Sequence, residues 1–234
     1  MMGFQIAGIV LLGLILILTS FVYKSFNRKE IDTSLNIKMM VIDAFFIAII
    51  AIFTFVPNIG FIAVSPFISF TLLHIPVLIG AYLFGYKRGL LYGLCFGICS
   101  YIQALTTGAG FNLLFAYPWT AIPPRVLFGL VAGITFSLIR KLYKSPLKGI
   151  YLSVAAMGLT LLHTCLVFLT LYIFFPTEVG GLLGSSNPVS NGTTLTFLAI
   201  ILIGMVGEMV LSGVIVPPTC LALSKVMPRL SKKK

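Results

Sequence analysis

The sequence predicts an all-α integral membrane protein with seven transmembrane helices, in which one additional N-terminal helix precedes a six-helix core. Hydrophobic residues make up 59% of the 234 residues and charged residues only 9%, whereas soluble domains contain about 25% charged residues. Apolar runs near the length of about 20 residues that crosses a bilayer recur along the chain. Fifteen of the 16 Lys and Arg residues lie in four clusters beside these runs. Membrane orientation therefore explains the net charge of +11, and nucleic acid is not an expected partner.

The N-terminal part is expected to be an uncleaved transmembrane helix within residues 1–23. A signal peptide starts with basic residues, but here the basic residues follow the apolar run 3–23. The N-terminus is therefore expected outside the cell. Residues 24–38 are expected to form a cytoplasmic linker, residues 39–226 the membrane core, and residues 227–234 a basic cytoplasmic tail.

Six further apolar runs make up the expected core. Their ranges are 39–56, 71–86, 90–105, 120–139, 149–175 and 192–226. Residues 59–70 contain Gly60 and Pro66 and are expected to be an outer loop or a re-entrant segment. A tight turn is expected at residues 87–89. The last run is long enough to tilt, or to break at residues 217–218.

Glycines recur every fourth residue at the start of the 90–105 run, at Gly89, Gly93 and Gly97. This spacing places them on one face of a helix, where small residues allow a neighbouring helix to approach closely. The four cysteines all lie inside apolar runs, and they predict neither a disulfide framework nor a metal site.

The positions of the basic clusters support the helix count. With seven helices and the N-terminus outside, all four clusters face the cytoplasm and the C-terminus lies inside. The loops at 57–70, 106–119 and 176–191 then face outward, and their only charged residue is Glu178. A missed helix would place the clusters on opposite sides of the membrane.

Charged residues inside membrane segments are costly and often functional. Asp43 is expected near the start of its helix, where the helix N-terminus favours a carboxylate. Glu208 lies midway along the last helix, where it could bind substrate, carry a proton or pair with Arg125. His163 is expected to be a hydrogen-bonded packing residue. His74, beside an outer loop, is expected either to bind substrate or to cap its helix and anchor it at the interface.

Arg125 is the one basic residue outside the four clusters, and it follows two prolines near the outer end of its helix. A guanidinium suits a carboxylate or a phosphate, so a substrate anion is one expected partner. The alternatives are an ion pair with Glu208 or Glu178, or a contact with lipid head groups. Other polar and aromatic residues are expected near the same outer end, and Glu208 lies deeper in the membrane. The candidate binding residues are Arg125, Trp119, Tyr117, Asn112, His74, Gln103 and Glu208.

The sequence contains no constellation typical of an enzyme, and no catalytic residue, cofactor or metal ligand is predicted. It also contains no nucleotide-binding motif of its own. If transport is active, the energy is expected to come from an ion gradient or from another subunit.

Four segments in order resemble one family. They are the AxxxA motif of Ala44 and Ala48, LLHIPVLIGAYLFGYKRG at 72–89, IPPRVLFGLVAG at 122–133 and GEMVLSGVIVPP at 207–218. Together they resemble the substrate-binding S component of energy-coupling factor (ECF) transporters, the bacterial vitamin importers, over residues 38–228. The N-terminal helix lies outside the usual pattern.

The resemblance implies a non-catalytic subunit of the bacterial cell membrane that binds a vitamin near the outer face. It further implies docking on a transmembrane scaffold subunit driven by two cytoplasmic ATPases. Ala44, Ala48 and Ala51 would form the docking stripe, or would pack within the bundle instead. The motifs look most similar to the pantothenate branch, with riboflavin, hydroxymethylpyrimidine, folate and cobalamin as alternatives.

Three other classes remain as alternatives. A stand-alone ion-coupled transporter would use Glu208 and Asp43 as proton carriers, but the two halves of the chain show no evident repeat. An intramembrane lipid enzyme would need paired acids or a nucleophile with a base. A purely structural membrane subunit would leave Arg125 unexplained.

Overall fold

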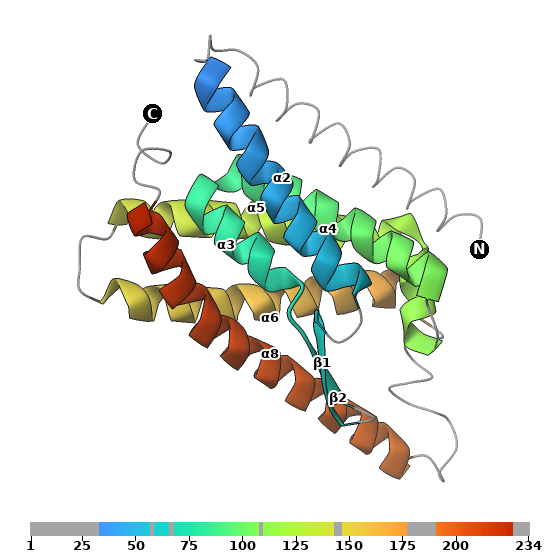
Figure 1. Cartoon of the computed structure of the whole chain (residues 1–234). Coiled ribbons are helices and arrows are strands. Elements are labelled where there is room, and N and C mark those ends of the chain that lie inside the picture. The colour runs from blue at the N-terminus through green and yellow to red at the C-terminus, as the bar shows by residue number, and fades with distance from the viewer. Residues whose placement is uncertain are drawn as a thin grey trace.

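The computed structural model describes residues 33–56, 59–65, 68–107, 110–142, 147–176 and 191–226. This part of the chain is a bundle of α-helices with one short hairpin and one 3₁₀ segment (Figure 1). The expected N-terminal helix, the loop residue Glu178 and the basic tail lie outside the described residues. The elements follow the apolar runs in order, and their bounds are α2 Thr33–Phe55, β1 Phe61–Ser65, β2 Ile68–Thr71, α3 His74–Phe84, α4 Tyr86–Thr107, η1 Gly110–Ala116, α5 Pro118–Leu142, α6 Lys148–Phe174 and α8 Asn191–Val226.

Among the described residues, four helices are long and apolar enough to cross a membrane, namely α4, α5, α6 and α8. The apolar part of α2 and the whole of α3 are shorter. With 11 residues, α3 is about 16 Å long, but ten of its residues are buried. It therefore forms the centre of the core, packed against α4, α5 and α8.

The expected turn at residues 87–89 is displaced toward the N-terminus. The chain reverses between α3 and α4 at Gly85, whose φ is 84°. Glycine adopts this left-handed conformation without steric cost because it has no Cβ. Lys87 and Arg88 consequently belong to the first turn of α4, and α3 ends before the sequence predicts.

The segment expected as an outer loop or re-entrant piece contains a hairpin. Strand β1 pairs antiparallel with β2, with Phe61 opposite Thr71 and Ser65 opposite Ile68. The pairing satisfies backbone groups that an irregular segment would leave unpaired. The hairpin is a local departure from the all-helical expectation, and β2 packs against α8 (Figure 1).

The glycine spacing on α4 produces the close helix contact that the sequence predicts. A Cβ at Gly93 would collide with the backbone carbonyl of Arg125, and one at Gly129 would collide with that of Gly89. Gly97 faces the backbone of Ile122. Helices α4 and α5 therefore pack backbone to backbone, and this contact fixes the position of Arg125.

Two further boundaries differ from the expected ranges. Helix α2 begins at Thr33, inside the expected linker. Helix α8 continues through Pro217 and Pro218 instead of breaking there, and it is 36 residues long. It crosses the bundle obliquely and packs on α6 and α3 (Figure 1).

Candidate functional site

The guanidinium of Arg125 is buried inside the bundle, with only 6% of the residue exposed. Its position follows from Pro123 and Pro124, which begin the second turn of α5. Because Pro124 has no N–H, it cannot donate to the carbonyl of Thr120. Arg125 Nη1 instead donates to the carbonyl of Ala121 at 2.8 Å and lies 3.4 Å from that of Thr120.

Two aromatic rings hold the other side of this guanidinium. Its carbon lies 4.8 Å from the ring centroid of Phe115 and 5.4 Å from that of Phe96. Phe115 belongs to η1 and Phe96 to α4, so three elements position the charge. Such cation–π contacts gain strength when they are removed from water.

Two histidines from different helices stack on each other, and one of them, His163, packs on the same Phe96 ring as Arg125. His74 begins α3 and is 1% exposed, and His163 lies within α6 and is 9% exposed. Their rings stack at 6.0 Å between centroids with an interplanar angle of 23°. The ring of His163 lies 4.8 Å from that of Phe128 and 5.7 Å from that of Phe96. We call His74, Arg125 and His163 the buried polar cluster.

The buried polar cluster holds unsatisfied hydrogen-bonding atoms. In the described part of the chain, four buried side-chain polar atoms have no partner, and all four belong to it. They are His74 Nδ1, His74 Nε2, Arg125 Nε and His163 Nε2. Each such atom costs about 1–3 kcal/mol when it stays unpaired, and folded proteins contain few of them. A ligand that pairs with these atoms would recover that cost.

The cluster lies at one end of the bundle, away from the basic residues of the expected cytoplasmic side. Arg140 is fifteen residues beyond Arg125 on the same helix, about 22 Å away. The guanidinium of Arg140 donates to the Leu83 carbonyl at 3.0 Å and lies over the ring of Tyr82. The ammonium group of Lys148 lies over the same ring. Both residues belong to the basic cluster at 140–148, which therefore lies at the opposite end of α3 and α5.

The structure pairs Glu208 with the hairpin and not with Arg125. Its carboxylate accepts hydrogen bonds from the backbone N–H of Thr71 at 2.8 Å and from the Thr71 hydroxyl. Among the described residues, Arg88 and Asp43 form the only ion pair. Within this part of the chain, the Arg125 charge therefore has no carboxylate partner.

Tyr117 and Trp119, the residues expected to form a stacking wall, pack against the end of α6. The rings of Tyr117 and Trp119 pack on each other at 5.3 Å and on Phe175 and Phe174 of the α6 end at 5.1 and 6.4 Å. Within the described residues, Phe96 and Phe115 lie over the guanidinium in their place. Tyr117 and Trp119 hold the start of α5 against α6.

The other candidate binding residues are His74, Gln103 and Asn112. His74 makes no capping hydrogen bond, so the capping alternative is wrong. Gln103 is half-buried on α4, seven residues after Phe96, and therefore shares its helix face. Asn112 lies in η1, and its side chain is outside the described residues.

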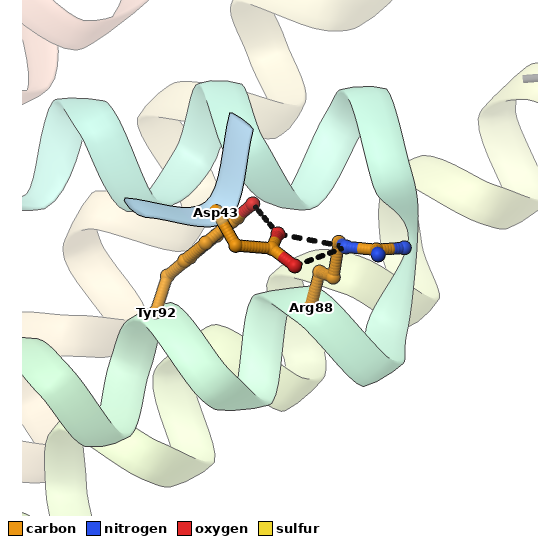
Figure 2. Close-up of polar contacts among 3 residues, drawn as sticks. All are labelled: Asp43, Arg88 and Tyr92. Carbon is orange, nitrogen blue, oxygen red and sulfur yellow. Dashed lines mark hydrogen bonds and ion pairs between the residues drawn. The ribbon is translucent and has the colours of Figure 1, made fainter. Parts of the chain in front are cut away.

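Asp43 lies in the middle of α2, so the expected stabilisation by the helix N-terminus does not apply. Its carboxylate accepts hydrogen bonds from Arg88 Nε at 2.8 and 3.1 Å and from the Tyr92 hydroxyl at 2.6 Å (Figure 2). Both donors come from α4. This contact, which we call the Asp43 clamp, ties α2 to α4.

The alanine stripe lies on the other face of α2. Ala44 and Ala48 are exposed and Ala51 is half-buried, whereas Phe46 and Ile50 point into the core. Phe46 stacks on the Tyr92 ring at 5.2 Å. Ala44 and Ala48 are therefore open to a partner, and they do not hold the described bundle together.

Sequence reasoning missed His163, Phe96 and Phe128 as members of this site. The expectation that His163 is hydrogen-bonded is wrong for Nε2, which has no partner. The only signal in the sequence is its polarity within an apolar helix. Phe96 and Phe128 carry no signal, since an aromatic residue in a membrane helix is ordinary.

Comparison with known proteins identifies the family. The profile of the family described as "ECF transporter, substrate-specific component" matches residues 38–220. The chain belongs to this family. The match includes every member of the buried polar cluster and both exposed alanines of α2, and it begins where the sequence resemblance begins. Membership and the apolar helices make the chain a multi-pass transport component of the bacterial cell membrane.

Two curated relatives share part of this S component sequence. The chain is 36% identical to the "Pantothenate transporter PanT" of Leuconostoc mesenteroides over 104 residues. This aligned region covers 43% of the chain and 51% of that protein. The chain is 30% identical to the "Pantothenic acid transporter PanT" of Lactococcus lactis over 181 residues. This aligned region covers 68% of the chain and 86% of that protein. The match thus spans about half of the first relative and most of the second.

Proposed function

We propose that this S component binds pantothenate and delivers it across the membrane as part of an ECF-type importer. The observation that carries the proposal is the buried Arg125, whose Nε is unpartnered and whose charge is not paired with a carboxylate of the described chain. Pantothenate supplies one carboxylate, together with an amide and two hydroxyl groups. The names of both relatives support the same substrate.

In this proposal, the vitamin enters from the outside, at the end of the bundle away from Arg140 and Lys148. The positive-inside rule supports this direction, because the basic cluster of residues 140–148 lies at the other end. Burial of the site means that the ligand is desolvated when bound. Charge-assisted hydrogen bonds to a guanidinium are then strong.

We propose that release inside is driven by partner subunits that hydrolyse ATP, which fits a chain whose sequence has no nucleotide-binding motif of its own. We propose a transmembrane scaffold subunit and two cytoplasmic ATPases, with the exposed Ala44 and Ala48 as the contact on this chain. Small residues on an exposed helix face permit close helix docking in a membrane. The scaffold would contact α2 on the face opposite the Asp43 clamp.

The test is a binding measurement on the purified full chain. Titration calorimetry with pantothenate in detergent is expected to show one site, and mass spectrometry of the protein as isolated is expected to detect the bound vitamin. Riboflavin, folate and hydroxymethylpyrimidine serve as controls. Binding of one of these in place of pantothenate would reject the substrate but retain the vitamin-binding role.

A second experiment separates the proposal from a stand-alone ion-coupled transporter. Uptake of labelled pantothenate is measured in cells with and without the ATPase subunits. We expect uptake to require them. Uptake that continues without the ATPases and follows the proton gradient would favour the alternative, in which Glu208 carries the proton.

A further inference from the structure

The two histidines of the buried polar cluster have a function that a carboxylate contact alone does not explain. Arg125 accounts for one of the four unpartnered atoms, and the other three belong to His74 and His163. The two rings come from α3 and α6, which are far apart in the sequence, yet they stack on each other. Packing alone would be served better by apolar rings, because an unpaired buried nitrogen is costly.

We propose that His74 and His163 form the uncharged half of the ligand site and recognise the hydroxyl and amide end of the bound molecule. A neutral imidazole has one donor and one acceptor nitrogen. Hydroxyl and amide groups have the complementary pattern, since they both donate and accept. The inference rests on the proposed function and adds that the site has two chemically distinct halves.

Phe96 connects the two halves of the proposed site, because Arg125 and His163 both pack on its ring. The guanidinium of Arg125 lies 5.4 Å and the ring of His163 lies 5.7 Å from the centroid of the Phe96 ring. Phe128 lies against both histidines, at 4.8 Å from His163 and 6.5 Å from His74. An apolar wall with polar groups at two ends suits an elongated ligand that has an anionic end and a neutral polar end.

The test compares three probes on the full chain in detergent. They are pantothenate, an analogue whose carboxylate is replaced by a neutral alcohol, and analogues that lack one of the two hydroxyl groups. Dissociation constants are measured by titration calorimetry. For the wild-type chain, we expect at least one deoxy analogue to bind at least about tenfold more weakly than pantothenate. The missing hydroxyl group would leave a buried histidine nitrogen unpaired.

His163→Leu is expected to weaken pantothenate binding while leaving the binding of that deoxy analogue nearly unchanged, so that the ratio of the two constants approaches one. His74→Leu is expected to act in the same way on the same or the other hydroxyl. Arg125→Ala should preserve this ratio and remove the preference for pantothenate over the neutral alcohol. His163→Gln keeps a hydrogen-bonding group near Nε2 and should retain part of the discrimination.

Thr160→Val is the matched control. Thr160 is buried on the same helix, three residues before His163, and its hydroxyl is already paired with the Ala156 carbonyl and the Ser212 hydroxyl. The change should lower the melting temperature without altering the discrimination. If the folded His74→Leu and His163→Leu variants discriminate the deoxy analogues as the wild type does, the inference is wrong and the proposed function stands. If the wild-type chain does not bind pantothenate, both the inference about the histidines and the proposed function are wrong.

Discussion

At the scale of single residues, Arg125 shows how a local sequence feature produces a buried charge. Pro124 leaves the Thr120 carbonyl without its usual helix donor, and Arg125 Nη1 donates to this carbonyl at 3.4 Å and to the Ala121 carbonyl at 2.8 Å. Phe96 and Phe115 cover the guanidinium. Nε remains a buried donor without a partner, and no described carboxylate pairs with the positive charge.

Arg125→Ala is therefore expected to weaken pantothenate binding by about 2–5 kcal/mol, the cost of truncating one partner of a desolvated charge pair. Titration calorimetry measures the loss. Arg125→Lys is the control, because it keeps the charge but loses the planar fork, and it should bind with intermediate affinity. Unchanged affinity in a folded Arg125→Ala protein would remove this residue from the site.

The Asp43 clamp is the second residue-scale feature. Asp43→Asn keeps the size of the side chain but removes the charge that Arg88 and Tyr92 contact. We expect the free energy of unfolding to fall by about 1.5–3 kcal/mol, because hydrogen bonds to charged groups contribute that much. Denaturant titration in mixed micelles measures the change. Tyr92→Phe removes one hydrogen bond and should cost less; equal stability of Asp43→Asn and wild type would contradict the assignment.

At the scale of elements, the contact between α4 and α5 positions the site. Gly89, Gly93 and Gly129 allow the two backbones to touch, and the carbonyl that Gly93 faces is that of Arg125. A side chain at Gly93 would push this part of α5 away from α4, and with it the guanidinium from Phe96. The glycine stripe thus couples helix packing to the geometry of the site.

Gly93→Ala is expected to destabilise the protein by about 1–3 kcal/mol through overpacking and to weaken pantothenate binding. The control is Gly158→Ala on α6, where an added Cβ meets nothing within 4 Å. That change should stabilise the helix by up to about 1 kcal/mol, since alanine is the better helix former. Thermal unfolding measures the stability of both variants, and calorimetry measures their affinity for pantothenate. Stability changes of the same sign in the two variants would contradict the prediction.

At the scale of the whole molecule, α2 has two faces with different tasks. One face carries Asp43, Phe46 and Ile50 and holds the helix on the bundle. The other exposes Ala44 and Ala48 together with the large side chain of Phe45. This face also exposes Val41 and Ile52, and two small residues among larger apolar side chains would suit docking on a second membrane subunit.

Ala48→Trp is expected to abolish pantothenate uptake in cells and to reduce co-purification with the scaffold subunit, while the purified chain keeps its affinity for pantothenate. Val154→Trp is the matched control, because it adds the same bulk at an exposed apolar position on α6. It should leave uptake intact. Normal uptake by Ala48→Trp would place the docking surface elsewhere.

The sequence by itself determined the membrane class, the approximate helix bounds, the family and the unusual status of Arg125. Apolar run length and charge position are local properties, and a bilayer converts them directly into spanning segments. The tertiary structure alone decided that Glu208 binds Thr71, that Asp43 binds Arg88, and that His163 meets His74. These pairings join residues that are distant along the chain, so helix packing selects the partners and no periodicity or spacing in the sequence encodes them.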